Sequence, residues 1–182
     1  MGDLRLAYFK TMAWASGAYA GGLMVVDENG LPLDFRYTDP VQPTRLQEVL
    51  YGKSLDRHMR QEVLFKHLTA RIDPRPNWLF VDDDQLLHLT ACAPVVSLAE
   101  TRLPPLREAA LCQVLSETEW LLQAGETGSP LKFRAYKPES GAIESLVDTL
   151  VLVADCGLDP VEPFNRVRQA LEIACAPSSA PA

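Results

Sequence analysis

Residues 21–72 read GGLMVVDENGLPLDFRYTDPVQPTRLQEVLYGKSLDRHMRQEVLFKHLTARI, and this stretch decides the fold. Its first part predicts a β-hairpin. Its second part predicts a short capped helix followed by a longer helix. The local signals all agree with one another, which is the mark of a well-specified folding unit. We therefore expect the rest of the chain to be organised around this unit.

The hairpin is predicted from two apolar arms around the pair Asn29-Gly30. Asn-Gly is the preferred pair of a two-residue type I′ turn, because both positions need a positive φ. Pro32 on the return arm has no amide hydrogen to donate, so we expect this arm at an edge of the sheet. Alternate residues of the same arm share one predicted buried face, namely Leu31, Leu33, Phe35 and Tyr37.

Two helices are predicted after the hairpin. Thr44 and Gln47 have the spacing of a capping box, in which each side chain satisfies an amide at the start of the helix. Gly52 is placed to end this helix. In the next helix, over residues 55–72, apolar residues fall on two sides, which is typical of a helix buried between layers.

The remaining segments predict a mixed sheet with helices. Apolar strands are expected at 78–81 and 94–98, and helices at 106–115, 143–154 and 160–174. A loose pair of strands is expected at 119–122 and 131–136. The fold class is therefore α/β or α+β, with a mixed central sheet of about six strands and flanking helices. We expect a single domain over residues 1–175, with any seam near 100–105, and a disordered tail at 176–182.

Composition limits the classes of protein. Hydrophobic residues make up 47% of the 182 residues and charged residues 23%, which excludes a mostly disordered chain. The formal net charge of −7 argues against binding nucleic acid through a field of the whole molecule, although a local basic patch could still bind it. The amino terminus shows no secretory signal or myristoylation motif, and no apolar run reaches the ~18 residues of a membrane span. A cytoplasmic protein without membrane contacts is the resulting expectation.

The four cysteines, Cys92, Cys112, Cys156 and Cys175, are too widely spaced for the close pairs of a zinc site. Reduced, mostly buried thiols are expected. His88 and Cys92 are four residues apart, but nothing marks the oxyanion donors that a Cys–His nucleophile would need. Serine hydrolase, P-loop and dinucleotide motifs are absent from the sequence, and we predict no cofactor.

The acidic triplet Asp82, Asp83 and Asp84 follows a predicted apolar strand. Carboxylates at the carboxyl ends of strands are where α/β folds build ligand and Mg²⁺ sites, so these three are the candidate metal ligands. The structural alternative is that Asp83 or Asp84 caps the next helical turn and that the others are solvated. A metal site would need at least one further carboxylate, for which Asp34 and Glu100 are the candidates.

A second candidate surface is a rim of basic and aromatic side chains, made of Arg36, Arg45, Tyr51, Lys53 and Arg57. Arg45 falls in the first turn of its predicted helix, where a cation opposes the helix dipole. A residue placed in this way can be recruited by an anionic partner. The alternative is a solvated charge that is tolerated at modest cost.

Three functions remain open, in this order. A strong structural pattern without catalytic motifs favours a non-enzymatic binding or assembly module, acting through protein–protein contacts or self-association at an exposed hairpin edge. The alternative is a metal-dependent hydrolase or nuclease built on the acidic triplet. The third is nucleotide or RNA binding on the basic rim, although nucleic acid is not the expected partner of so acidic a chain.

Overall fold

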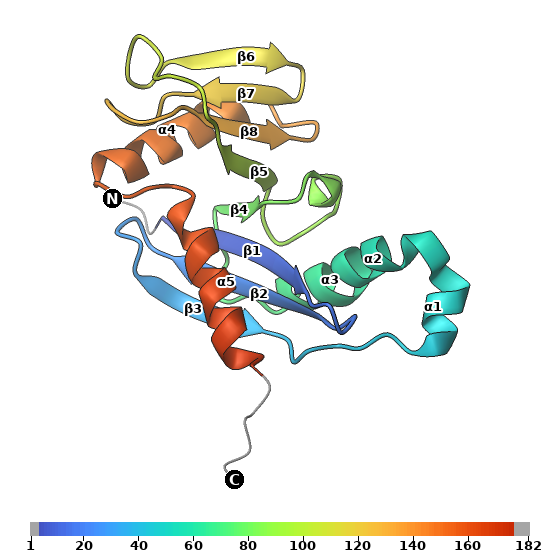
Figure 1. The fold of residues 1–182 in the computed structure, drawn as a ribbon. Coiled ribbons are helices and arrows are strands. Elements are labelled where there is room, and N and C mark those ends of the chain that lie inside the picture. Colours follow the sequence, from blue (N-terminus) through green and yellow to red (C-terminus); the bar gives the residue numbers. More distant parts are fainter. Residues whose placement is uncertain (1–3, 177–182) are drawn as a thin grey trace.

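Eight strands form one continuous mixed sheet in the order β3-β2-β1-β4-β5-β8-β7-β6 (Figure 1). The computed structural model describes residues 4–176. The strands are β1 (Leu6–Ala13), β2 (Tyr19–Val26), β3 (Pro32–Tyr37), β4 (Trp78–Val81), β5 (Val95–Glu100), β6 (Cys112–Ser116), β7 (Glu119–Leu122) and β8 (Leu131–Ala135). β1, β4 and β5 are parallel to one another, and the other neighbours pair antiparallel.

Helices cover the sheet from both sides. The helical segments are α1 (Arg45–Tyr51), η1 (Gly52–Ser54), α2 (Leu55–His58), η2 (Met59–Phe65), α3 (Lys66–Thr69), η3 (Asp84–Leu86), α4 (Ala142–Asp155) and α5 (Glu162–Ala174). Figure 1 shows α5 crossing β1, β2 and β3, and α4 lying beside β7 and β8. These two helices pack around Tyr8 and Phe133 on one face, whereas η2 and α3 pack around Phe9 on the opposite face. The central strand β1 is therefore buried from both sides.

The predicted hairpin is confirmed, since β2 and β3 pair antiparallel, but its turn differs from the predicted type. The positive φ falls on Gly30, at 74°, and not on Asn29. The Asp27 carboxylate accepts hydrogen bonds from the backbone N–H groups of Asn29 and Leu31, at 2.9 and 2.8 Å. This local side-chain bonding stabilises a longer loop in place of the two-residue type I′ turn.

β3 lies at an edge of the sheet, as Pro32 predicted. The face of β3 that was predicted to be buried is largely exposed: Leu31, Leu33 and Tyr37 are 61%, 46% and 46% exposed. This face is left largely uncovered because α5 lies mainly over β1 and β2. Phe35 is the member of the face that packs against the core cluster. Alternation shows that a strand has two different faces, but it does not show that another element covers one of them.

The first helix begins and ends as predicted. The Thr44 hydroxyl accepts a hydrogen bond from the backbone N–H of Gln47 at 3.2 Å, and the Gln47 side chain accepts one from the backbone N–H of Thr44 at 2.9 Å. Gly52, with a φ of 48°, ends α1. α1 projects from the body of the molecule (Figure 1), and each of its residues is at least partly exposed.

The predicted helix at 106–115 is wrong, because this segment is an irregular stretch followed by β6. The buried Gln123 holds the stretch with hydrogen bonds. Its side-chain Oε1 accepts from the backbone N–H of Leu106 at 2.8 Å, and its backbone carbonyl accepts from Ala110 at 2.8 Å. Helix propensity is a weak preference, and these tertiary contacts outweigh it.

The predicted fold class is confirmed as a single compact α/β domain with a mixed sheet and flanking helices, although the sheet has eight strands rather than about six. β5 pairs with β8, so the sheet continues across residues 100–105. The tail predicted at 176–182 lies, apart from residue 176, outside the described residues. Within residues 4–176 no helix is long and apolar enough to cross a membrane. The four cysteines are free, but three are half-buried and Cys156 is exposed, so the expected burial is not found.

Candidate functional site

The strand order reverses at the junction of β1 and β4. The chain passes from β1 to β2 and β3 on one side, and then crosses to β4 and β5 on the other. Ligands of open α/β sheets bind outside the carboxyl ends of strands at such a junction. A pocket of about 500 Å³ opens here. Its charged side chains are Arg60, Asp82, Asp83, Asp84, Lys132 and Arg134.

Each of the three aspartates after β4 has a partner of its own. Asp82 forms an ion pair with Lys10 of β1, and Asp84 forms an ion pair with Arg134 of β8. Asp83 caps η3, where its carboxylate accepts a backbone hydrogen bond at 2.9 Å. The triplet thus contains one helix cap, and its other two members face side-chain cations from β1 and β8.

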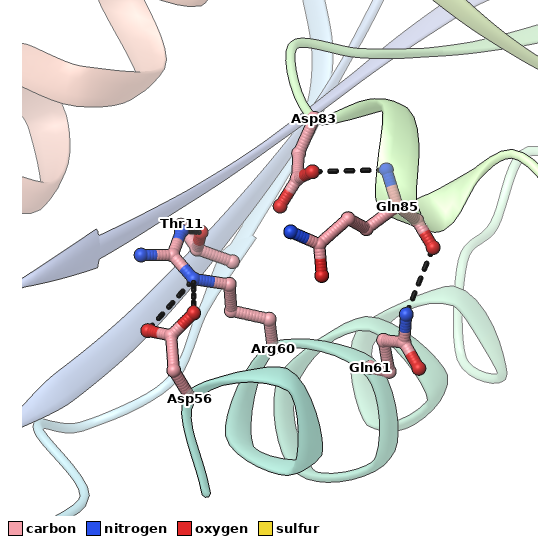
Figure 2. Close-up of polar contacts among 6 residues, drawn as sticks. All are labelled: Thr11, Asp56, Arg60, Gln61, Asp83 and Gln85. Carbon is pink, nitrogen blue, oxygen red and sulfur yellow. Dashed lines mark hydrogen bonds and ion pairs between the residues drawn. The ribbon is translucent and has the colours of Figure 1, made fainter. Parts of the chain in front are cut away.

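Arg60 reaches the pocket from η2, which is a π-helical turn (Figure 2). Its Nε donates to the two carboxylate oxygens of Asp56, at 3.1 and 2.9 Å. Its Nη1 donates to the Thr11 hydroxyl at 2.6 Å. Rare π-helical turns are frequent at functional sites. Here the turn holds a guanidinium against the carboxyl-terminal half of β1.

The next residue, Gln61, fixes the loop that carries the aspartates. The Gln61 side chain is buried, and its Nε2 donates to the backbone carbonyl of Gln85 at 2.8 Å. The backbone N–H of Gln85 donates in turn to Asp83 at 2.9 Å, and Figure 2 shows the two contacts together. The loop after β4 is therefore held both by its own cap and by η2.

β7 and β8 add a charged face to the pocket. Lys132 and Arg134 alternate with Phe133, which is buried in the cluster beneath α4, so the two cations lie on the opposite face of the sheet. Glu119 of β7 bridges them, since its carboxylate oxygens lie 3.3 Å from Lys132 Nζ and 3.1 Å from Arg134 Nη2. The hydrogen bond from Arg134 holds the pKa of Glu119 below its usual range. The same contact, reinforced by the charge of Asp84, raises the pKa of Arg134.

These side chains do not fit a divalent metal ion. Mg²⁺ and Ca²⁺ bind where several oxygen ligands converge on one point. Within residues 4–176, no three His, Cys, Asp or Glu side chains lie close enough to share an ion. Of the two further carboxylates considered, Asp34 pairs with Arg36 in β3, and Glu100 lines a different pocket. The metal site at Asp82, Asp83 and Asp84 thus stays a prediction that the ion pairs of Asp82 and Asp84 do not support.

The predicted basic rim is not gathered into one site. Arg36 donates to Asp34 and to the backbone carbonyl of Arg71, beside a pocket of about 670 Å³. The other four residues lie on α1, η1 and α2: Arg45, Tyr51, Lys53 and Arg57. The Tyr51 ring stacks on His58, with centroids 4.1 Å apart, so one of its faces is already covered. These residues stay a predicted binding surface without a shared pocket.

His88 and Cys92 line one pocket in the irregular segment after η3. Burial raises the pKa of the Cys92 thiol, which leaves less thiolate at neutral pH. This supports the interpretation of Cys92 as a packing residue rather than a nucleophile.

Five side chains of the junction were not predicted: Lys10, Thr11, Arg60, Lys132 and Arg134. The last two could have been found, because the alternation LKFRA at 131–135 marks one polar face that carries only cations. Lys10 could also have been found, since it is the charged residue between apolar ones on its side of β1. Thr11 and Arg60 meet only in three dimensions and leave no local signal.

No protein-family model matches the chain, and no curated protein sequence matches it either. Solved structures do match. The match to the crystal structure of human ENDOV covers 96% of this chain and 87% of the ENDOV chain, with a TM-score of 0.53 and 15% sequence identity. Endonuclease V from Ciona intestinalis, in complex with a 23mer DNA containing an inosine followed by a ribo-adenosine, covers 94% and 87%, with a TM-score of 0.50 and 11% identity.

The Argonaute of Marinitoga piezophila, in complex with a 5′ OH guide RNA, also matches. It covers 91% of this chain, which spans 29% of the Argonaute, with a TM-score of 0.50 and 9% identity. At these identities the likeness establishes a shared fold.

The comparisons correct two predictions. The first choice, a non-enzymatic module acting through protein–protein contacts, is wrong, because the structures that share this fold include endonucleases. The expectation that nucleic acid is not a partner is wrong as well, because the matching structures include complexes with DNA and with guide RNA. The findings favour the alternative, a hydrolase or nuclease. The net charge of −7 describes the whole chain, and it does not decide what a local basic surface binds.

Proposed function

We propose that this protein acts on nucleic acid, and that the pocket at the junction of β1 and β4 receives the sugar–phosphate backbone of a DNA or RNA strand. One observation carries the proposal. The pocket brings three basic side chains, Arg60, Lys132 and Arg134, to the carboxyl ends of parallel strands. The fold is one in which other proteins have been solved with DNA or RNA.

The basic side chains are suited to phosphate. A guanidinium has five N–H donors in a planar fork that matches phosphate oxygens. Arg60 uses Nε and Nη1 for Asp56 and Thr11, so donors remain for a ligand. The carboxylate partner of Arg60 is 51% exposed, and such exposed pairs contribute only ~0–1 kcal/mol. A phosphate can therefore bind Arg60 without breaking a strong interaction.

Hydrolysis of the bound strand is the second candidate, and the fold that this chain shares with endonuclease V favours it. Phosphodiester hydrolysis needs a positioned water and a cation that stabilises the developing charge. Asp82 and Asp84 would have to release Lys10 and Arg134 to hold a metal ion for this purpose.

Binding is tested by fluorescence anisotropy with labelled single- and double-stranded DNA and RNA, at low salt and with EDTA. We expect wild-type binding to weaken with salt, with a slope of log K against log salt of about −2 to −3 for three basic side chains. Arg60→Ala and Arg134→Ala should each weaken binding about tenfold and reduce the slope by about 1.

Arg168→Ala is the matched control, because Arg168 is 40% exposed and pairs with Glu172 on α5, away from the pocket. Its binding should equal that of the wild type. An absence of binding to every oligonucleotide, or equal losses in the control and in the pocket variants, would contradict the proposal. Incubation of the same oligonucleotides with Mg²⁺ or Mn²⁺ tests the second candidate. A cleavage product that disappears in Asp82→Asn would support it.

A cytoplasmic location goes with this function as a proposal, and the four free thiols support it, since a reducing compartment keeps cysteines unpaired. Fractionation of cells that express the full chain checks the location.

A further inference from the structure

We infer that the Lys10 ammonium takes the place of a divalent cation at Asp82, so that the pocket binds nucleic acid without a metal ion. The nature of the ligand rests on the proposed function. The exclusion of metal rests on the ion pairs alone, and the two can be tested separately.

Lys10 is held in place by its surroundings. On its side of β1 it follows Tyr8, which is buried in the apolar cluster, and precedes Met12, which packs against that cluster. The Lys10 side chain is only 21% exposed, and a charge beside an apolar cluster is costly unless it is paired. The parallel register that pairs Phe9 with Val81 puts Asp82 next to Lys10 and supplies the partner.

The pair is held in position because Lys10 lies in the central strand β1 and Asp82 directly follows the central strand β4. β1 pairs with β2 and β4, and β4 pairs with β1 and β5, so neither backbone can shift without breaking ladder bonds on two sides. A divalent ion bound to Asp82 would lie against the ammonium and be repelled by it. The same holds at Asp84, which faces the guanidinium of Arg134. The carboxylate charges are thus balanced from within the chain.

An ammonium does not replace a metal ion in every respect. It balances the charge of the Asp82 carboxylate from the Tyr8 side of β1 and does not itself line the pocket. It offers no coordination position at which a water molecule would become a strong nucleophile. A pocket built in this way holds a strand but lacks that route to hydrolysis, so binding should be insensitive to EDTA.

The test is to replace Lys10 by an oxygen ligand and to measure metal binding without any activity assay. Lys10→Asp places a second carboxylate beside Asp82. We expect the melting temperature of this variant to rise by about 5 °C at a Mn²⁺ concentration about a hundredfold above its Kd. The wild-type chain should show no such rise. Isothermal titration calorimetry with Mn²⁺ should give one binding event in the variant.

Two controls make the result specific. Lys66→Asp also adds a carboxylate beside an existing one, because Lys66 pairs with Glu62 on the helix surface at 2.6 Å. It should show no rise, since two exposed carboxylates alone do not build a site. Adding Asp82→Asn to Lys10→Asp should abolish the rise. If circular dichroism shows that Lys10→Asp does not fold, Lys10→Asn offers a neutral oxygen ligand at the same position.

The outcomes separate the two proposals. A wild-type chain that binds Mn²⁺ as tightly as Lys10→Asp overturns the inference, and so does a folded Lys10 variant that gains no metal binding. Oligonucleotide binding that is lost in EDTA also overturns it. If no oligonucleotide binds while Lys10→Asp gains Mn²⁺, the proposed function fails, and the role of Lys10 at Asp82 stands.

Discussion

The two halves of the sheet are covered differently. β1, β2 and β4 are packed on one face by α5 and on the other by η2 and α3. β7 and β8 have α4 on one face, and on the other face they present Glu119, Lys132 and Arg134. The four residues of β4 are all buried, whereas β8 alternates between buried and half-buried. The pocket arises at the boundary, where the helical layer over the sheet ends and its charged face begins.

The largest expected contrast between the halves is in stability. Phe9 is fully buried in the doubly covered half, and its ring meets that of Phe65 edge-on with centroids 5.1 Å apart. Phe9→Ala should lower the free energy of unfolding by about 3–5 kcal/mol. Val114→Ala, on the exposed edge strand β6, should change it by less than ~0.5 kcal/mol. Urea unfolding measures both variants, and similar losses would contradict the difference in covering.

A smaller loss is expected where α5 meets the sheet. A Cβ atom at Gly22 would lie 2.9 Å from Val167 Cγ1 and 3.1 Å from Leu171 Cγ. Gly22→Ala should therefore destabilise the protein by about 1–3 kcal/mol. Gly125→Ala is the control in the other half, because the nearest atom there is 3.9 Å away, and it should be close to neutral. Combining Gly22→Ala with Val167→Ala should destabilise less than the sum of the two changes, since the shorter side chain makes room.

The boundary itself is examined by a double-mutant cycle on Lys10 and Asp82. Their side chains are 21% and 35% exposed, against 50% and 45% for Lys66 and Glu62 on the helix surface. Lys10→Met and Asp82→Asn should show a coupling energy of about 0.5–1 kcal/mol. The cycle with Lys66→Met and Glu62→Gln should give about 0.3–0.5 kcal/mol. A stronger coupling on the helix surface would contradict the ordering by burial.

The smallest effect concerns pH in the charged half. The hydrogen bond from Arg134 lowers the pKa of Glu119 in the folded protein. The stabilisation from Glu119 is therefore complete above the unfolded pKa of about 4.3 and is lost as the pH falls through the lower folded value. Glu119→Gln should make the melting temperature fall less steeply with acidity below about pH 4. An identical pH profile for the variant and the wild type would show that the bridge adds nothing to stability.

The features that were predicted correctly have local causes. The capping box of Thr44 and Gln47 joins residues three apart, and Gly52 ends its helix through its own φ. The position of Asp82 was also within reach, because an acidic triplet after an apolar strand falls at the end of that strand in any sheet. Such signals involve residues so close in sequence that their geometry follows from the backbone alone.

The features that were missed depend on distant parts of the chain. Lys10 and Asp82 are 72 residues apart, and Arg60 and Thr11 are 49 residues apart. Their partnership depends on strand order and on where η2 docks, which a single sequence does not specify. The predicted helix at 106–115 is wrong for the same reason, since its hydrogen bonds come from Gln123, the residue that follows β7. A triplet of aspartates can thus be located from sequence while the cations that decide its chemistry cannot.

The two successive glycines of β2 have a consequence for folding fidelity. A Cβ atom at Gly21 would approach Leu68 Cδ1 to 3.1 Å, on the face opposite to the contacts of Gly22 with α5. Helices on both faces of the sheet thus contact β2 at Gly21 and Gly22, where the strand carries no side chains. A slip of β2 by one residue would put Ala20 or Leu23 at this place, so that one helix could no longer dock. The glycine pair therefore specifies the register of β2, because helices cannot dock on both faces of a strand that is shifted by one residue.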